Sequence, residues 1–514
     1  MDRSGIIRRA PEDAQSRPYD LIVIGGGIYG AMLTLESARR GLKPLLLERA
    51  DFGGETSFNS LRIVHGGLRY LQKLDLHRFK ESVTERKWFL KTFPHIVKPL
   101  PCLMPLYGKG MHRPSILRFA LKLNDRLSAG RNHDIPVGNH LHDGSVIGDA
   151  ETRRLFPDVS AVGLKGAAKW HDAVMLNSQR ILIEVLRWAC RLGADVLNYT
   201  EANDLVMAGS AVGGVNAVDC ISGQTARYHA PVVINAAGPW SRKMAGAFHK
   251  DIPKLFRPSL AWNLLIDRPA LSDHALAVSP QQNKGHTYFL VPWQGKLFAG
   301  TGHVPIEWKP GMPVHPTDEQ IVGFLADLNN AVPNLSLEPS DIIHVHAGLL
   351  PAKRRGGAEL TVREVIIDHG KQGGPQGLYS VSGVKFTTAR LVAEKTIRVF
   401  APQRASYTPE GLALPELTRY EHRFKPILLS NGTGGEREHL LDALRSIVQD
   451  ESVCRLEDVI FRRTALYENA EKAIDLAPHI LKTMRPDEDA SEKELTRLAT
   501  QLTHPKKRHD SKKR

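Results

Sequence analysis

The sequence is short of cysteine and has no long apolar segment. Its 514 residues include four cysteines that lie far apart and show no metal-ligand spacing: Cys102, Cys190, Cys220 and Cys454. This pattern excludes a disulfide framework, predicts no metal site and favours a reducing compartment. No apolar run reaches the roughly 18–20 residues of a membrane-spanning helix. Any redox chemistry therefore has to come from a bound cofactor.

Both ends of the chain are charged and poor in apolar residues. Residues 1–18 lack the apolar core of a secretory signal, so we expect a disordered leader there. Residues 504–514 carry six Lys or Arg and one Asp, which is typical of a disordered basic tail. The net charge of +14 suits an anionic substrate, an acidic membrane face or nucleic acid. Because no nucleic-acid motif and no aromatic stacking platform is present, we predict no nucleic-acid partner.

A nucleotide-binding β-α-β unit occupies residues 19–48. An apolar strand-like run at 20–24 enters a glycine-rich turn and a helical segment, and a second apolar run follows at 44–47. In such units the first glycine allows the tight turn, the second lets the backbone approach a pyrophosphate, and the third lets the helix pack closely on the strand. The N–H groups at the helix N-terminus face the phosphates, and the final acidic residue accepts hydrogen bonds from an adenosine ribose. The predicted cofactor-binding residues of this unit are Gly25, Gly26, Gly27, Ile28, Tyr29, Gly30 and Glu48.

The rest of the chain predicts further strands and then a helical region. Strand-like segments dominate residues 260–302 and suggest a separate sheet on the substrate side. Residues 228–235 read as one strand that enters the small-residue turn 236–240, and a third glycine-bearing turn at 379–388 leads into a helix. Beyond Pro402 the remaining patterns are helical, at 436–448, 456–466, 470–484 and 492–502.

A basic amphipathic segment lies at residues 113–131. Its apolar residues alternate with Arg118, Lys122, Arg126 and Arg131. A helix of this kind can lie on a membrane surface. It can equally be a solvated helix with its apolar side in the core, and the sequence leaves both interpretations open.

The motif at residues 65–71, His-Gly-Gly-Leu-Arg-Tyr-Leu, resembles a known family. Together with the first glycine turn, the 236–240 turn and the 383–388 turn, it is similar to the FAD-dependent glycerol-3-phosphate dehydrogenases of the D-amino-acid-oxidase-like flavoprotein superfamily. The resemblance runs from about Tyr19 to Phe400. It extends into the helical region through residues 456–464, Leu-Glu-Asp-Val-Ile-Phe-Arg-Arg-Thr.

The resemblance implies an α/β (α+β) fold. Residues 19–405 would form a Rossmann-like FAD-binding domain interleaved with an antiparallel-sheet substrate domain, and residues 406–503 a C-terminal all-helical domain. It also implies FAD as the cofactor. The further cofactor-binding residues that it implies are Thr56, Ser57, Ser60, His65, Gly66, Gly238, Gly383 and Lys385.

The resemblance implies an alcohol oxidation in which hydride passes to flavin N5 while a base removes the hydroxyl proton. His65 is the candidate base, because an imidazole accepts a proton at neutral pH; packing against the flavin edge is the alternative. Arg69 would bind the substrate's anionic group, with a surface ion pair as the alternative. Lys385 would face the flavin or the substrate. Tyr70 would orient the substrate or pack in the core.

Three segments depart from the family pattern, all on the substrate side. Leu350 stands where the family carries a substrate-binding arginine, and Arg354 or Arg355 could compensate for it. The stretch 260–263, from Leu260 to Asn263, replaces a Lys-Gly-Ser-His-like sequence, and the stretch 300–303 replaces a Gly-Thr-Thr-Asp-like turn. We therefore expect a substrate that is larger or less anionic than glycerol 3-phosphate.

The leading hypothesis is an FAD-dependent dehydrogenase that oxidises a polyol phosphate or related alcohol and passes electrons to a quinone. The alternatives are a flavin oxidase or amine dehydrogenase that uses oxygen, and a flavin-binding scaffold without turnover. We expect a cytoplasmic protein, either free or peripheral on the cytoplasmic membrane face. The sequence leaves the true substrate, the electron acceptor and the oligomeric state open.

Overall fold

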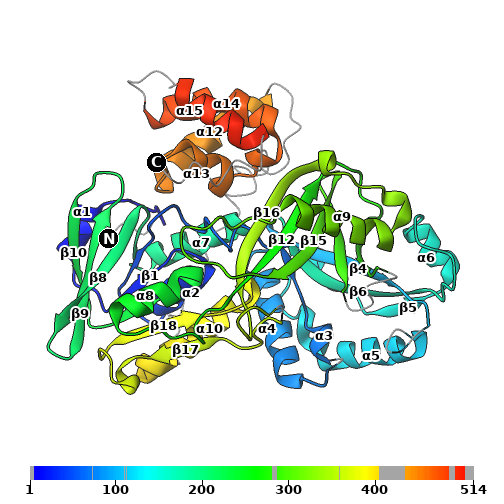
Figure 1. The fold of residues 1–514 in the computed structure, drawn as a ribbon, viewed down its shortest axis with the longest axis horizontal. Helices are drawn as coiled ribbons and strands as arrows, with labels where there is room; N and C mark the ends of the chain where they lie inside the picture. Colours follow the sequence, from blue (N-terminus) through cyan, green and yellow to red (C-terminus); the bar gives the residue numbers. More distant parts are fainter. Residues whose placement is uncertain are drawn as a thin grey trace.

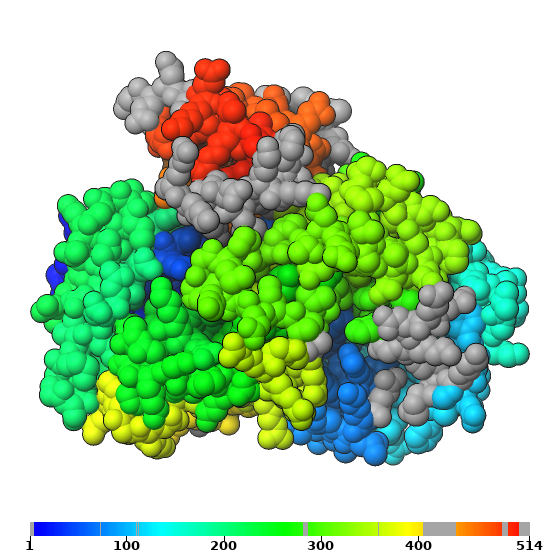
Figure 2. Space-filling view, viewed as in Figure 1, coloured from blue at the N-terminus to red at the C-terminus, as the bar shows by residue number. Residues whose placement is uncertain are grey.

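The computed structural model describes residues 5–71, 73–108, 110, 113–280, 286–357, 359–404, 435–485 and 492–503. Two lobes lie side by side, and a helical domain formed by the end of the chain rests across them (Figure 1). The space-filling view shows the same domain, in orange and red, seated above both lobes (Figure 2). The domain boundary expected at 405/406 and the basic tail 504–514 fall outside the described residues.

The first lobe is built on a six-stranded sheet in the order β17-β18-β11-β1-β2-β7. All neighbouring strands are parallel except β17 and β18. Apolar side chains cover both faces of β1, as expected for a strand between two layers. The bounds are β1 (Leu21–Ile24), β2 (Pro44–Leu47), β7 (Asp195–Leu197), β11 (Val233–Asn235), β17 (Val365–Asp368) and β18 (Leu378–Ser382).

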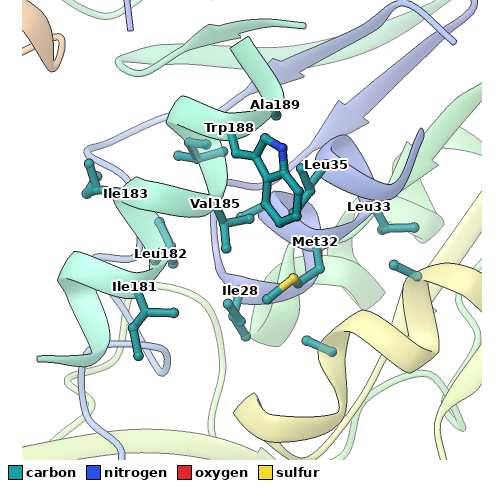
Figure 3. Packing of buried hydrophobic residues seen from close by; sticks show 14 of the residues in the cluster. Ile28, Met32, Leu33, Leu35, Ile181, Leu182, Ile183, Val185, Trp188 and Ala189 are labelled. Carbon is teal, nitrogen blue, oxygen red and sulfur yellow. The ribbon is translucent and has the colours of Figure 1, made fainter. Parts of the chain in front are cut away.

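Helices cover one face of this sheet, where Leu21 and Val23 enter a large apolar core. Helix α2 packs between α7 and α10, and its side chains interlock with those of α7 around Trp188 (Figure 3). The opposite face, with Ile22 and Ile24, is covered by a three-stranded antiparallel sheet and lies near α8. The bounds are α2 (Ile28–Ala38), α7 (Ser178–Arg191), α8 (Ser241–Phe248), α10 (Ala389–Phe400), β8 (Thr200–Ala208), β9 (Ala211–Asp219) and β10 (Thr225–His229).

The second lobe is a nine-stranded sheet in the order β16-β12-β15-β14-β13-β4-β6-β3, with β5 beside β6. Its pairs are antiparallel except β4 with β13. The bounds are β3 (Ile63–Val64), β4 (Val97–Pro105), β5 (Ser145–Ile147), β6 (Ala167–Met175), β12 (Pro258–Ile266), β13 (Ala275–Val278), β14 (Tyr288–Trp293), β15 (Lys296–Pro305) and β16 (Ile342–Pro351). Its helices are α3 (Leu68–Leu71), α4 (Leu76–Thr92), α5 (Pro114–Leu127), α6 (Asp149–Leu155) and α9 (Asp318–Ala331).

The C-terminal domain has its own apolar core, which also receives Phe58 from the first lobe. It contains α12 (Gly435–Asp450), α13 (Leu456–Asp458), a π-helical turn (Val459–Arg463), α14 (Ala470–Met484) and α15 (Glu492–Thr503). Together the three parts confirm the predicted α/β fold with an all-helical C-terminal region. Within the described residues, no helix has both the length and the apolarity to cross a bilayer.

Two expectations about local structure are wrong. Residues 5–18 are not a disordered leader: Ile7 is buried and bridges to Glu451, and α1 (Pro11–Gln15) follows it. Apolar contact and the 2.7 Å ion pair of Arg9 with Asp219 hold this segment on the first lobe. The segment 228–235 is not one strand, because Pro231 separates β10 from β11 and these belong to different sheets.

Candidate flavin and substrate site

A cavity of about 1340 Å³ lies at the meeting point of the three parts. The first lobe contributes the glycine turn, the end of β2 and the turn at 236–240, and the second lobe contributes β12, β15 and β16. The C-terminal domain adds further residues, among them Arg455 and Arg462. The sequence-predicted residues that line the cavity are Gly25, Gly27, Ile28, Tyr29, Glu48, Thr56, Ser57, Ser60, His65, Gly238, Gly383 and Lys385.

The glycine turn has the backbone geometry that its sequence predicts. Gly25 has φ +107°, and a Cβ at this position would lie 2.7 Å from the carbonyl oxygen of Ala236. A Cβ at Gly30 would collide with the carbonyl of Gly25, so a larger residue would push α2 away from β1. Gly26 and Gly30 do not line the cavity and serve the turn itself. The N-terminus of α2 is thereby brought to the cavity wall.

Glu48 closes the turn from the end of β2. Its carboxylate accepts hydrogen bonds from the N–H of Gly26, at 2.6 Å, and of Ala50, at 2.9 Å. Burial raises the pKa of Glu48, and the two N–H groups oppose this effect. Glu48 also lines the cavity. Its contact with an adenosine ribose stays a prediction, with which this position is compatible.

The loop between Asp51 and Ser60 carries several side-chain hydroxyl groups. Ser57 Oγ accepts a hydrogen bond from the N–H of Ile28 at 3.0 Å, and Thr56 Oγ1 donates to the carbonyl of Leu349 at 3.1 Å. Ser60 Oγ is buried and has no hydrogen-bond partner among the described residues. A buried hydroxyl without a partner is costly unless a ligand or water satisfies it. This part of the wall therefore fits a polar ligand.

Tyr29 joins the first and third glycine turns. Its hydroxyl donates to the carbonyl of Lys385 at 2.8 Å and accepts from the Lys385 N–H at 3.2 Å. A Cβ at Gly383 would collide with this hydroxyl, which explains the glycine. Gly238 starts the second small-residue turn with φ +52°. The three turns therefore lie next to one another in the cavity wall.

His65 follows directly after β3 and hydrogen-bonds to Asp172 of β6. The antiparallel register pairs Val64 with Ala173, so the next residues face each other, and His65 Nδ1 lies 3.0 Å from Asp172 Oδ2. Asp172 also accepts from the N–H of Gly66 at 2.7 Å and from Arg86 Nη1 at 3.1 Å. Burial acts to raise the pKa of Asp172, but His65, Arg86 and Gly66 outweigh it and lower that pKa to about 2. The half-exposed imidazole is thus held at the cavity by a buried carboxylate.

Of the other predicted catalytic residues, Lys385 lines the cavity and packs against Tyr70. Lys385 Nζ lies 4.3 Å from the ring centroid of Tyr70, and the guanidinium of Arg78 lies 4.6 Å from the same ring. Arg69 is exposed on α3, and neither Arg69 nor Tyr70 lines the cavity. Gly66 also lies outside the lining, where its N–H holds Asp172.

The sheet of the second lobe presents an uncharged surface to the cavity. Asn263 and Leu350 line it, and Asn263 accepts from Thr301 Oγ1 and donates to the carbonyl of Asn59, both at 2.9 Å. The expectation that Leu260 faces the substrate is wrong. Leu260 is buried in the core of the sheet. Arg354 and Arg355 do not replace the family's arginine, because they lie outside the lining and Arg355 pairs with Glu307 at the surface.

The sequence matches the family described as "FAD dependent oxidoreductase" (DAO) over residues 20–398. That span contains both lobes and almost every residue of the site. The chain belongs to this family. Its cofactor is FAD, and the glycine turns, the α2 N-terminus and the unsatisfied Ser60 hydroxyl fit that dinucleotide.

Individual relatives also support membership of this family. A glycerol-3-phosphate dehydrogenase of Synechocystis sp. is 30% identical over 418 residues, which cover 78% of this chain and 73% of the relative. An alpha-glycerophosphate oxidase of Streptococcus pyogenes is 34% identical over 351 residues, covering 67% of this chain and 56% of the oxidase, so the chain spans little more than half of that relative. The structure of glycerol-3-phosphate dehydrogenase from Bacillus halodurans complexed with FAD covers 97% of this chain and 96% of its own, with a TM-score of 0.71 and 22% identity, and shows the shared fold.

Sequence reasoning missed two features of this flavoprotein. Asp172 was not singled out, because its partnership with His65 depends on the register of β3 and β6. Arg455, Arg462 and Arg497 of the C-terminal domain also line the cavity, and only the motif at 456–464 signalled that this region takes part.

Proposed function

We propose that this FAD-dependent oxidoreductase is a dehydrogenase that oxidises a secondary alcohol to a ketone, with a polyol phosphate or a related alcohol as substrate. The observation that carries the proposal is the His65–Asp172 pair at the cavity wall. The relatives support the reaction class, since both are named for the oxidation of a glycerol phosphate.

His65 acts as the base in this proposal. Asp172, with a pKa of about 2, is a carboxylate at neutral pH and can only accept a hydrogen bond. His65 Nδ1 therefore carries the proton and donates it to Asp172, which leaves Nε2 with a free lone pair. A substrate hydroxyl at hydrogen-bond distance from Nε2 would pass its proton there as the C–H bond breaks. When bound, FAD supplies the acceptor for the hydride.

Lys385 acts on the charge of the substrate, and the Tyr70 ring packs against its ammonium group. The lysine ammonium lies over the Tyr70 ring, and the Lys385 carbonyl accepts a hydrogen bond from Tyr29 in the cavity wall. A cation here would attract an anionic group of the substrate and offset negative charge that develops during hydride transfer. Arg69, exposed on the neighbouring α3, would guide an anionic substrate toward the entrance.

The substrate is less anionic or larger than glycerol 3-phosphate. The cavity lining contributed by β12, β15 and β16 contains no lysine or arginine. Arg62 also lines the cavity, but it is buried and bound to Glu468 at 3.0 Å, so its charge is already compensated. A phosphate dianion would meet few free cations near His65, and each missing charge-assisted hydrogen bond would weaken binding by about 1.5–3 kcal/mol.

The test is a panel of alcohols added anaerobically to the yellow holoenzyme, with loss of the flavin absorbance as the readout. We expect at least one polyol, or ester of a polyol, to bleach the flavin faster than glycerol 3-phosphate does. Bleaching by amino acids but by no alcohol would indicate the amine dehydrogenase instead. If no substrate reduces a flavin that dithionite does reduce, the protein is a flavin-binding scaffold.

A quinone is our proposed electron acceptor, and oxygen is the alternative that the streptococcal oxidase favours. Stopped-flow reoxidation of the reduced protein decides between them: faster reoxidation by ubiquinone than by dissolved oxygen supports the dehydrogenase.

Peripheral binding to an anionic membrane would bring the protein to its quinone. On α5, Leu117 and Leu121 are buried, whereas Phe119 is 70% exposed beside the basic residues Arg118 and Lys122. The buried leucines support a helix with its apolar side in the core, and the exposed part would suit an acidic lipid surface. Phe119→Ser should reduce co-sedimentation with phosphatidylserine vesicles, and equal sedimentation of both proteins would exclude this surface.

A further inference from the structure

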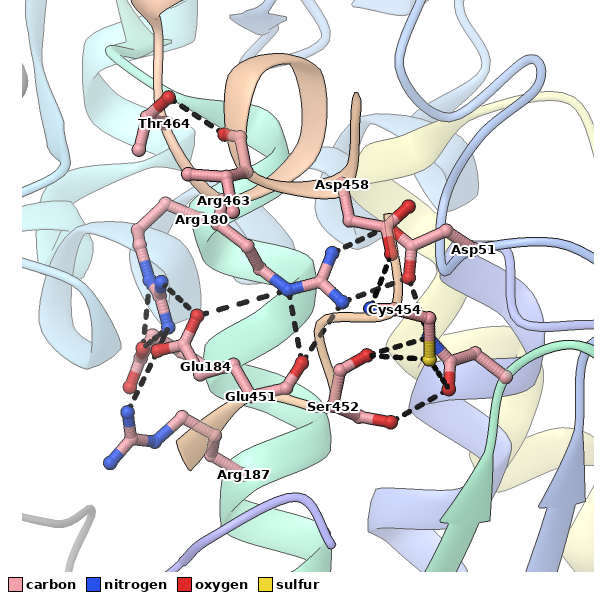
Figure 4. A network of polar contacts seen from close by, with 12 residues as sticks. Asp51, Arg180, Glu184, Arg187, Glu451, Ser452, Cys454, Asp458, Arg463 and Thr464 are labelled. Carbon is pink, nitrogen blue, oxygen red and sulfur yellow. Dashed lines mark hydrogen bonds and ion pairs between the residues drawn. The ribbon is translucent and has the colours of Figure 1, made fainter. Parts of the chain in front are cut away.

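The motif at residues 456–464 lies where the C-terminal domain meets the flavin-binding lobe, and the proposed reaction leaves it without a role. The domain rests across both lobes in Figure 1, and Figure 4 shows polar contacts that join it to the first lobe. The facing segment is the loop 51–58, which follows Glu48 and carries Thr56 and Ser57.

Arg463 holds the start of the loop. Its guanidinium is buried and donates to both carboxylate oxygens of Asp51, at 2.6 and 2.8 Å. It also donates to the backbone carbonyl of Glu451 at 3.0 Å. A planar guanidinium bound to both carboxylate oxygens fixes direction as well as distance. Asp51 is therefore tied to the C-terminal domain in one orientation.

Further buried contacts fix the domain that carries Arg463. Glu451 accepts from Arg180 at 2.8 Å and from Arg187 at 2.9 Å, and both arginines belong to α7 (Figure 4). Asp458 accepts from the hydroxyl of Tyr199 at 2.6 Å. Helix α7 also packs directly on α2. The contacts around Arg463 and the pyrophosphate-binding helix α2 are therefore both held by α7.

Arg462 reaches the other end of the same loop and lines the cavity. Its Nη2 donates to the carbonyl of Gly54 at 3.3 Å, and its guanidinium lies 4.6 Å from the ring centroid of Phe58. Thr56, Ser57 and Phe58 line the cavity beside it. Arginine has five N–H donors, and in the described part of the chain only the Gly54 carbonyl engages one of them. A half-buried cation with spare donors thus borders the hydroxyl-bearing loop.

We propose that the C-terminal domain completes the flavin site: Arg463 positions the 51–58 loop, and Arg462 offers its cation to the cofactor's diphosphate. The charges agree with this assignment, since the diphosphate is the anionic part of FAD and guanidinium matches phosphate oxygens. The inference depends on FAD as cofactor and not on the proposed substrate, so it holds or fails independently of the dehydrogenase reaction.

The first experiment compares FAD release from the holoenzymes of wild type, Arg462→Gln and Arg462→Lys, followed as the rise in free-flavin fluorescence after dilution. We expect Arg462→Gln to release FAD about tenfold faster or more, as the loss of one charge-assisted contact implies. Arg462→Lys keeps the charge and should fall between the other two, and added salt should narrow the differences. Arg445→Gln is the matched control, because Arg445 is exposed in the same domain and pairs only with Asp442 among the described residues.

Release from Arg462→Gln at the wild-type rate would overturn the role of Arg462. The positioning role is tested on the wild-type protein alone, by hydrogen exchange of the apo and FAD-bound forms. Because coupling is reciprocal, FAD should slow exchange in residues 456–464 as well as in 51–58. Slower exchange confined to residues 51–58 would overturn the proposed positioning of this loop by Arg463.

Discussion

His65 Nδ1 and Asp172 Oδ2 lie 3.0 Å apart although 107 positions separate them in the chain. Two paired residues of β3 produce this contact, because Ile63 faces Val174 and Val64 faces Ala173 across the sheet. Arg86 and the N–H of Gly66 hold the second carboxylate oxygen. The imidazole therefore enters the cavity with its orientation and its protonated nitrogen already set.

Replacing Asp172 by asparagine should reduce catalysis more than binding. The amide keeps the size of the side chain but removes the negative charge that holds the Nδ1 proton and stabilises the imidazolium. We expect kcat to fall by about 10²-fold, within the usual range for a general base, with little change in KM.

Steady-state kinetics of Asp172→Asn and of a control, Asp327→Asn, measure this effect. Asp327 is also in the second lobe and accepts a 2.7 Å hydrogen bond from Tyr288, but it lies outside the cavity lining. The control should keep the wild-type kcat. An unchanged kcat in Asp172→Asn would show that His65 does not need its carboxylate partner.

Asp172 should also make folding stability depend on acid pH. Its pKa of about 2 in the folded protein lies below the roughly 3.9 of an unfolded aspartate. The folded state then binds fewer protons, so the contribution is complete above about pH 4 and is lost as the pH falls toward 2. This difference of about 1.9 pKa units corresponds to about 2.6 kcal/mol. The difference in Tm between wild type and Asp172→Asn should therefore shrink as the pH falls from about 4 to about 2. A constant difference would contradict the shift.

The flavin-binding half of the site could be predicted because its signals are local. Gly25, Gly30 and Glu48 act within one β-α-β unit, where the spacing along the chain determines the geometry. Asp172 could not be found in this way, since its role arises from strand register. The burial of Leu260 could have been predicted from the sequence. Leu260 and Asn263 are three positions apart, and side chains alternate along a strand, so the two residues are expected to face opposite sides.

Replacing Gly27 by valine should abolish flavin retention and leave the protein folded. A Cβ at Gly27 would lie 3.3 Å from Ser57 Oγ, and the two methyl groups of valine would extend into the space that the cofactor's diphosphate needs. The control is Gly323→Val on α9, where a Cβ meets no atom within 4 Å. Absorbance ratios of the purified proteins report flavin content, and circular dichroism reports folding. A yellow Gly27→Val protein would refute the placement of the diphosphate at this turn.

Replacing Leu350 by arginine should raise activity on glycerol 3-phosphate. Leu350 lines the cavity from β16, next to β12, and no lysine or arginine of this sheet borders the cavity. A guanidinium there would form a charge-assisted contact with phosphate, and we expect KM to fall by about tenfold or more. Leu350→Gln is the control that adds a polar group without a charge. Glycerol lacks the phosphate, so the activity on glycerol should not rise in either variant. If Leu350→Arg binds FAD normally but gains no activity on glycerol 3-phosphate, a single missing cation does not explain the specificity, and the pocket has diverged at Asn263 and Thr301 as well.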